Sequence, residues 1–196
     1  MVKQIIMEEY DIWGSKPLMT EVFLHDASNV LKRGLRYFLG DGYKWLPEYE
    51  EIAEWLSNNK GKGLLFYGSN GRGKTVLCSK VLSIIFQHYL NIEFSQFDAI
   101  DLGESYRSSL GNTELMWSRN PLFVDDIGTE SIINDYGEKH DIVSELIDKA
   151  EKNNRLLVLT TNLTPNEISD RYGLRTLDRL KAIVKSVKSI GNSLRS

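Results

Sequence analysis

Four short apolar runs mark the second part of the chain as strands of a buried sheet. Each run is rich in Leu, Val, Ile or Phe and is bounded by Gly, Pro, Asn or charged residues. The runs are GLLFYG (63–68), NIEFSQF (91–97), PLFVDD (121–126) and RLLVLTTN (155–162). Continuous apolar runs of this length are typical of parallel strands that are covered on both faces.

Amphipathic segments lie between these strands. In residues 74–89 and 138–152, apolar side chains recur at the spacing of one helix face, and charged side chains occupy the other face. Strand alternating with helix predicts an α/β fold, in which helices cover a parallel sheet.

The first 60 residues have a different pattern. They contain two helical candidates, 27–38 and 47–58, and the second starts with Pro47 and acidic residues, as helices commonly do. The SNNKGKG segment then turns the chain into the first strand. We therefore expect a small helical N-terminal extension, residues 1–60, ahead of a domain that spans residues 61–196.

Three of the four tryptophans, Trp13, Trp45 and Trp55, lie in this extension. Side chains of this size usually pack inside a fold. The alternative is a surface that docks a partner.

Composition narrows the class of protein. The formal net charge is -3, yet residues 151–196 hold nine Lys and Arg against four Asp and Glu. A basic end on an acidic body suits an anionic partner, and a solvated charged face is the alternative.

The single cysteine and three scattered histidines indicate neither a disulfide framework nor a Cys/His metal cluster. The N-terminus lacks a signal-peptide pattern and no run reaches the length of a membrane span, so we expect a cytosolic protein without membrane contact.

The motif GSNGRGKT, residues 68–75, predicts a phosphate-binding loop. A predicted strand precedes it and an amphipathic helix follows, which is the context that this motif requires. Its glycines allow backbone N–H groups to surround an oxyanion, and the helix N-terminus adds partial positive charge. Lys74 is expected to reach the β- and γ-phosphates of ATP, and Thr75 to offer its hydroxyl to Mg²⁺. The predicted nucleotide-binding residues are Gly68, Ser69, Asn70, Gly71, Arg72, Gly73, Lys74, Thr75 and Val76.

Two adjacent carboxylates end the third predicted strand, in FVDDIGTE. We expect Asp125 to hold Mg²⁺, directly or through water, and Asp126 to polarise the attacking water. Mg²⁺ and Lys74 supply the positive charge that lets the two acids remain ionised side by side. Glu130 has two open interpretations: it orients a basic group across a subunit interface, or it caps the helix after the IGT turn.

Asn162 ends the fourth predicted strand, in LTTN. Its amide can bond both the attacking water and the γ-phosphate, which would make it a sensor of ATP against ADP. The alternative is a turn residue before a helix that starts at Thr164 or Asn166. Further along, Arg171, Arg175 and Arg179 recur every four residues, which would give one arginine per turn if that stretch is helical. A guanidinium beside a γ-phosphate stabilises transition-state charge.

On these residues the chain resembles AAA+ ATPases of the DnaC/IstB group, which contains bacterial and phage helicase loaders and IstB-type transposition helpers. The resemblance rests on GSNGRGKT, FVDDIGTE, LVLTTN, RYGLRTLDRL and the terminal GNSLR, in this order over residues 60–196. It implies a P-loop NTPase fold of the AAA+ type. It also implies a truncated or absent C-terminal lid, since only 34 residues follow Asn162.

The resemblance also implies roles by position. Asn162 matches the residue called sensor I, and Arg179 matches the arginine finger that enters the site of a neighbouring subunit. Arg175 matches the other arginine of that motif, without an assigned role. Arg195 matches the nucleotide-contacting arginine called sensor II.

Partners follow from the resemblance alone. It implies ATP-dependent head-to-tail self-association, either on a replicative helicase with single-stranded DNA or with a transposase on duplex DNA. Residues 1–60 match no known docking domain, so they do not identify the partner. Members that initiate replication insert a DNA-binding helix within residues 100–120. Here that segment has only Arg107 and Arg119 against three acids, which predicts a weak DNA contact.

The predicted function is ATP hydrolysis by a DnaC-like helicase loader in DNA replication, with an IstB-like transposition helper as the alternative. Related ATPases place Glu where this chain has Asp126, so we expect slow, partner-stimulated turnover. A nucleotide-gated adaptor that barely hydrolyses ATP is a further alternative. A small-molecule kinase is disfavoured, because such enzymes rarely combine the Asp-Asp-x-Gly-x-Glu and Thr-Thr-Asn motifs.

Overall fold

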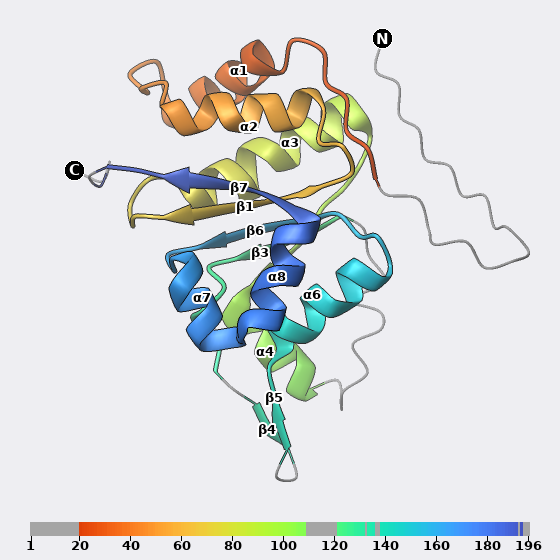
Figure 1. The fold of residues 1–196 in the computed structure, drawn as a ribbon. Helices are drawn as coiled ribbons and strands as arrows, with labels where there is room; N and C mark the ends of the chain where they lie inside the picture. Colours follow the sequence, from red (N-terminus) through yellow and green to blue (C-terminus); the bar gives the residue numbers. More distant parts are fainter. Residues whose placement is uncertain (1–19, 109–120, 132, 136–137, 192, 194–196) are drawn as a thin grey trace, which may run out of the picture.

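The computed structural model describes residues 20–108, 121–131, 133–135, 138–191 and 193. A parallel sheet of five strands, in the order β2-β3-β6-β1-β7, runs through the middle of the molecule (Figure 1). Every pairing along it is parallel, which confirms the predicted class of fold. The strands are β1 (Gly63–Gly68), β2 (Ser95–Asp98), β3 (Leu122–Asp125), β6 (Leu157–Thr161) and β7 (Val184–Ser189).

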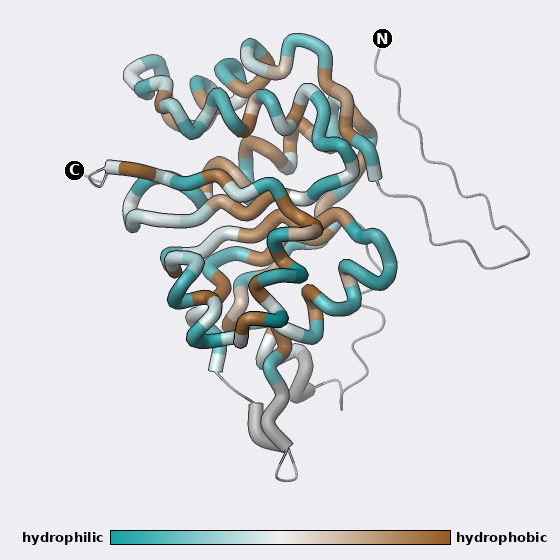
Figure 2. Tube along the Cα trace, viewed as in Figure 1, coloured by the Kyte–Doolittle hydropathy of each residue, from teal (hydrophilic) through white to brown (hydrophobic). Residues whose placement is uncertain are grey.

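Helices cover both faces of the sheet, and the apolar residues of strands and helices face each other between the layers (Figure 2). One face carries α1 (Ala27–Leu39), α2 (Pro47–Ser57) and the helix after β1, which runs through η1 (Val76–Leu82), α3 (Ser83–Ile85) and η2 (Phe86–Leu90). The other face carries α4 (Ala99–Ser108), α6 (Ile142–Lys152), α7 (Pro165–Tyr172) and α8 (Leu174–Ile183).

Helices α1 and α2 share one hydrophobic core with the sheet. Trp55 is buried, stacks on Phe86 with ring centroids 6.0 Å apart, and donates its indole N–H to the carbonyl of Lys62 at 2.8 Å. Trp45 is half-buried and stays near the surface, whereas Trp13 lies outside the described residues. The boundary at residue 60 and a docking role for residues 1–60 stay predictions.

The prediction of a helix over 138–152 is wrong in its first turn. Glu138–His140 form strand β5, which pairs antiparallel with β4 (Ile133–Asp135). Helix α6 begins at Ile142 because the Asp141 carboxylate accepts the backbone N–H groups of Val143 and Ser144, both at 3.2 Å. Capping of this kind satisfies donors that have no partner inside the helix, so it determines where the helix starts.

The C-terminal segment also differs from a single helix. Helix α7 starts after Thr164, as predicted, and Thr164 forms a reciprocal capping box with Glu167. Gly173, with φ of 85°, then separates α7 from α8. Arg171 therefore lies on a different helix from Arg175 and Arg179, so the expected single row of arginines is not formed. The chain then crosses back to the sheet as β7, a strand that was not predicted.

Candidate nucleotide-binding site

The GSNGRGKT motif forms the loop between β1 and the following helix, at the carboxyl edge of the sheet. Gly68, Gly71 and Gly73 adopt φ values of 116°, 73° and 79°, which residues with a side chain rarely adopt. A Cβ on Gly68 would lie 2.5 Å from the carbonyl oxygen of Ser189, whereas a Cβ on Gly73 would meet nothing within 4 Å. The loop thus packs against β7 at its start and is open at its end, where a phosphate would enter.

Lys74 lies at the centre of this edge. Its ammonium group donates to the carbonyls of Gly68 and Ser69 at 2.8 and 2.9 Å and to Asn162 Oδ1 at 2.8 Å. The side chain is buried within these acceptors. A cation held in this position, beside N–H groups at a helix N-terminus, is suited to bind an anionic phosphate.

Asp125, at the end of β3, faces two hydroxyl groups. Its Oδ1 accepts from Thr75 Oγ1 at 3.2 Å and from the hydroxyl of Thr160. Carboxylate and hydroxyl oxygens are the ligands that Mg²⁺ prefers, and Mg²⁺ usually takes its remaining ligands from water and phosphate. Among the described residues no group of three or more His, Cys, Asp or Glu is arranged to hold a metal ion by itself. The chemistry of this pair fits a magnesium ion that is shared with a nucleotide.

Asp126 is held in an unusual backbone conformation, with φ of 55°. Its N–H donates to Thr160 Oγ1 at 2.8 Å, and its Oδ1 accepts from Asn162 Nδ2 at 2.7 Å. Burial raises the pKa of Asp126, and the neighbouring Asp125 carboxylate raises it further, while Lys74 lowers it. A carboxyl with a raised pKa binds a proton more readily, as a general base must.

The structure therefore brings together five of the predicted residues: Lys74, Thr75, Asp125, Asp126 and Asn162. They come from the helix after β1, from β3 and from the end of β6, strands that adjoin in the sheet. Their individual chemical roles remain predictions. Thr160 is a member of the cluster that the sequence prediction missed, although its place in LTTN, two residues before Asn162, indicated its strand.

Arg179, another predicted site residue, does not lie in this cluster. Arg179, on α8, forms ion pairs with Asp148 and with Glu151, the latter at 3.3 Å from its Nε. Both acids belong to α6, so Arg179 is held on the surface of its own chain. Arg195 lies outside the described residues, and Arg175 is exposed on α8.

Arg72 does not point toward the phosphate cradle, although it belongs to the loop. Its guanidinium donates at 2.7 Å to Oε1 of Glu48, a residue in the first turn of α2. Both side chains are buried. Ser189 Oγ donates to the same carboxylate oxygen at 3.3 Å. The ion pair therefore ties the phosphate loop to α2 and β7, a link that the sequence prediction missed.

Replacing Glu48 with glutamine is expected to lower the free energy of unfolding by about 3 kcal/mol, because one charge of a buried pair loses its partner. Urea-induced unfolding measures the change. Glu54→Gln is the matched control, since Glu54 lies on the same helix and pairs with Lys185 at the surface. The control should leave the unfolding midpoint unchanged. Equal midpoints for both variants would show that the buried pair contributes nothing to stability.

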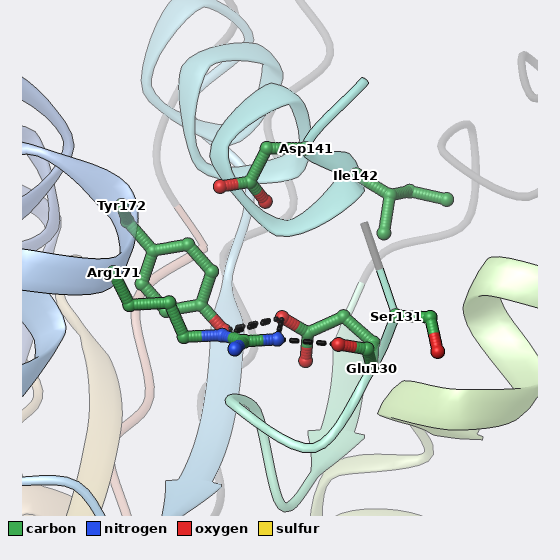
Figure 3. Close-up of a pocket in the computed structure, with 6 residues that line it drawn as sticks. All are labelled: Glu130, Ser131, Asp141, Ile142, Arg171 and Tyr172. Carbon is green, nitrogen blue, oxygen red and sulfur yellow. Dashed lines mark hydrogen bonds and ion pairs between the residues drawn. The ribbon is translucent and has the colours of Figure 1, made fainter. Parts of the chain in front are cut away.

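Glu130 is also buried, and it contacts the turn before it and the end of α7 (Figure 3). Its carboxylate accepts from Arg171 Nη2 at 2.9 Å and from the Tyr172 hydroxyl at 2.6 Å. Its carboxylate thus binds a basic group of α7, and the N-cap of α6 is Asp141. A role across a subunit interface stays a prediction.

The parallel sheet and its covering helices have the arrangement found in P-loop NTPases of the AAA+ type. Comparison with solved structures agrees. The chain is similar to the DnaC helicase loader, with a TM-score of 0.57, 21% sequence identity, and coverage of 86% of this chain and 93% of that chain. It is similar to DnaI, with a TM-score of 0.55, 19% identity, and coverage of 87% and 86%. It is also similar to AMPPCP-bound DnaA from Aquifex aeolicus, with a TM-score of 0.56, 19% identity, and coverage of 78% and 50%.

Sequence comparison adds less. A family model described as Nephrocystin 3, N-terminal, matches residues 41–111, which include the phosphate loop but neither Asp125 nor Asn162. No curated protein sequence matches the chain. Where the structure describes the chain, no helix has the length and apolarity that a bilayer span requires.

Proposed function

We propose that this chain binds and hydrolyses ATP and acts as a DnaC-like helicase loader in DNA replication. The position of Asn162 supports the proposal that the chain hydrolyses ATP. Its amide accepts from Lys74 on one side and donates to Asp126 on the other, at 2.8 and 2.7 Å. One side chain thus contacts both the phosphate-binding cation and the proposed base, as a sensor of the γ-phosphate requires.

In this proposal each residue acts through the atoms that now bond to one another. Lys74 exchanges its contacts with loop carbonyls for phosphate oxygens. Thr75 and Asp125 hold Mg²⁺, which supplies positive charge that polarises the phosphate. Asp126 orients the attacking water, and the hydrogen bond that Asn162 donates to it keeps that carboxylate directed at the site.

Slow turnover is consistent with the geometry of Asp126. Aspartate is one methylene shorter than glutamate, and one oxygen of Asp126 is already bonded to Asn162. The shorter side chain must therefore reach the water with its other oxygen, which favours slow turnover. A partner that brings the water closer to Asp126 would stimulate hydrolysis.

The helicase-loading part rests on similarity to the DnaC helicase loader over most of both chains. In the proposed assembly, ATP-bound subunits associate head to tail, and Arg179 of one subunit completes the site of the next. Its ion pairs with Asp148 and Glu151 keep the guanidinium extended along α6 before association.

Two measurements on the full chain test this proposal. Single-turnover release of phosphate from ATP, without any acceptor, should be slow and should increase when single-stranded DNA and a hexameric replicative helicase are present. Asp126→Asn should retain ATP binding and lose hydrolysis. Absence of phosphate release under all of these conditions would contradict the ATPase proposal.

Binding to single-stranded and duplex oligonucleotides of equal length, compared at one stated salt concentration, tests the class of partner. A loader should prefer the single strand. A preference for duplex DNA would overturn the loader assignment and favour a transposition helper.

A further inference from the structure

We infer that Glu130 is a positioning residue for the proposed ATPase reaction: it holds the turn that carries Asp126 and joins that turn to helix α7. The inference rests on the proposed function for its link to catalysis. Glu130 itself is not predicted to contact phosphate or metal. It acts through the backbone of the turn.

The first observation is the burial of a charge. The Glu130 side chain is only 4% exposed, and a carboxylate in such a place is costly unless donors surround it. Here the donors are complete. Arg171 donates from Nε at 3.2 Å and from Nη2 at 2.9 Å, the Tyr172 hydroxyl at 2.6 Å, and the N–H of Gly128 at 2.8 Å. Arg171 also donates to the backbone carbonyl of Glu130, so one guanidinium binds both its side chain and its backbone.

The second observation is the position of Gly128, two residues after Asp126. The turn between them depends on the left-handed φ of Asp126 and on the φ of 105° at Gly128. Glycine adopts a positive φ freely, but for Asp126 such a φ is costly and persists only where the surroundings enforce it. The Thr129 hydroxyl stabilises the turn by donating to the Asp126 carbonyl at 2.8 Å. Glu130, which follows the turn, stabilises it because its carboxylate accepts the Gly128 N–H.

The third observation is that these contacts connect the turn, helix α7 and Asn162 to one another. Arg171 and Tyr172 are the last residues of α7, and α7 begins three residues after Asn162. Asn162 in turn bonds the Asp126 side chain. The turn is therefore held by Asn162 at the Asp126 carboxylate, by Thr160 and Thr161 at the backbone of Asp126 and Ile127, and by Glu130 at the Gly128 amide. Figure 3 shows Arg171 and Tyr172 converging on Glu130 from the same helix, with the dashed contacts joining them.

The same connections lead toward the face that carries Arg179. Helix α8, which carries Arg179, follows α7 directly after Gly173. Glu130 consequently joins the chain's own proposed base to the helix next to α8, whose Arg179 we propose to complete the neighbouring site.

The test compares the wild type with Glu130→Gln and with Tyr172→Phe, a milder variant that removes one donor and keeps the ring. Glu167→Gln is the matched control, since it weakens the cap of the same helix without contact to the turn. On each full chain we measure single-turnover hydrolysis, affinity for a fluorescent ATP analogue, and amide hydrogen exchange of residues 126–130. Loss of alignment should lower the rate of Glu130→Gln about 10- to 100-fold, with ATP affinity changed less than about twofold. Exchange of the 126–130 amides should become faster in this variant and in Tyr172→Phe, and it should stay unchanged in the control.

Two results would overturn the inference. One is a Glu130→Gln protein with wild-type exchange in residues 126–130. The other is an equal loss of rate in Glu167→Gln, which would show that general weakening of α7 is responsible. If Glu130→Gln does not fold, Tyr172→Phe decides between the same outcomes. The exchange measurement does not require hydrolysis, so a wild type without ATPase activity would refute the proposed function and still leave the positioning role decided by the exchange result.

Discussion

Replacing Lys74 with alanine is expected to abolish detectable ATP hydrolysis and to weaken ATP binding about 10- to 100-fold. The expected loss follows from the three acceptors around the ammonium group, the Gly68 and Ser69 carbonyls and Asn162 Oδ1. They fix a single positive charge at the mouth of the glycine loop, where phosphate oxygens would take their place. Removing that charge leaves only backbone dipoles to bind an anion, and it also frees Asn162 from one of its two partners.

The measurement is titration with a fluorescent ATP analogue, followed by single-turnover hydrolysis. Lys80→Ala is the matched control, because Lys80 is an exposed lysine of the same helix. The control should bind and hydrolyse ATP as the wild type does. If Lys74→Ala and Lys80→Ala bound ATP equally well, the phosphate site would have to lie elsewhere.

Replacing Arg179 with alanine is expected to lower the turnover that depends on self-association about 10³-fold. The affinity for ATP should stay nearly unchanged. The finger of one subunit would act on the phosphate of the next, so its loss affects the transition state and not the binding of ATP to its own subunit. Stability should change by less than about 1 kcal/mol, since Asp148 and Glu151 are 47% and 40% exposed and can be solvated without Arg179. Turnover per subunit is measured as protein concentration increases, with Lys181→Ala of the same helix as the control.

Mixing of variants makes this test specific for action between subunits. Arg179→Ala subunits bind ATP but lack the arginine, whereas Lys74→Ala subunits lack the lysine but keep the arginine. At an interface between the two, an intact Arg179 faces an intact phosphate loop, so the mixture should recover part of the activity that both variants lack. No recovery, or equal turnover by Arg179→Ala and wild type, would contradict the assignment.

Strands β1, β3 and β6 were predictable because burial on both faces leaves a continuous apolar run. The prediction of a strand over 91–97 is wrong in its bounds, since β2 spans Ser95–Asp98 and none of its residues is buried. The GLLFYG run has the same bounds as β1, and Trp55 packs inside, as its size suggested. The meeting of Lys74, Asp125 and Asn162 was also predictable, because residues at the carboxyl ends of adjoining parallel strands lie at one edge of the sheet. Local sequence and a topological rule were sufficient for these features.

The missed features depend on contacts between distant residues. Strand β7, VKSVKS, has polar residues at four of its six positions, and its two apolar residues, Val184 and Val187, lie three positions apart. Neither the continuous nor the alternating pattern of a strand is therefore visible. It is a strand because β1 offers it a partner. The ion pair of Arg72 with Glu48 and the Glu130 cluster likewise join residues that no spacing connects. The arginine repeat would give one arginine per turn only in a continuous helix, and Gly173 divides that stretch into two helices.

The place of β1 in the sheet has a consequence for how the protein is made. Strand β1 lies between β6 and β7, and both are synthesised long after it. A nascent chain must therefore carry β1 without a neighbouring strand until β6 has been made, and its second neighbour comes only with residues up to Ser189. Long-range parallel pairing of this kind folds slowly and exposes apolar segments meanwhile. Gly68, at the start of the glycine loop, pairs with Ser189, so competence to bind nucleotide would arise only after β7 has joined the sheet.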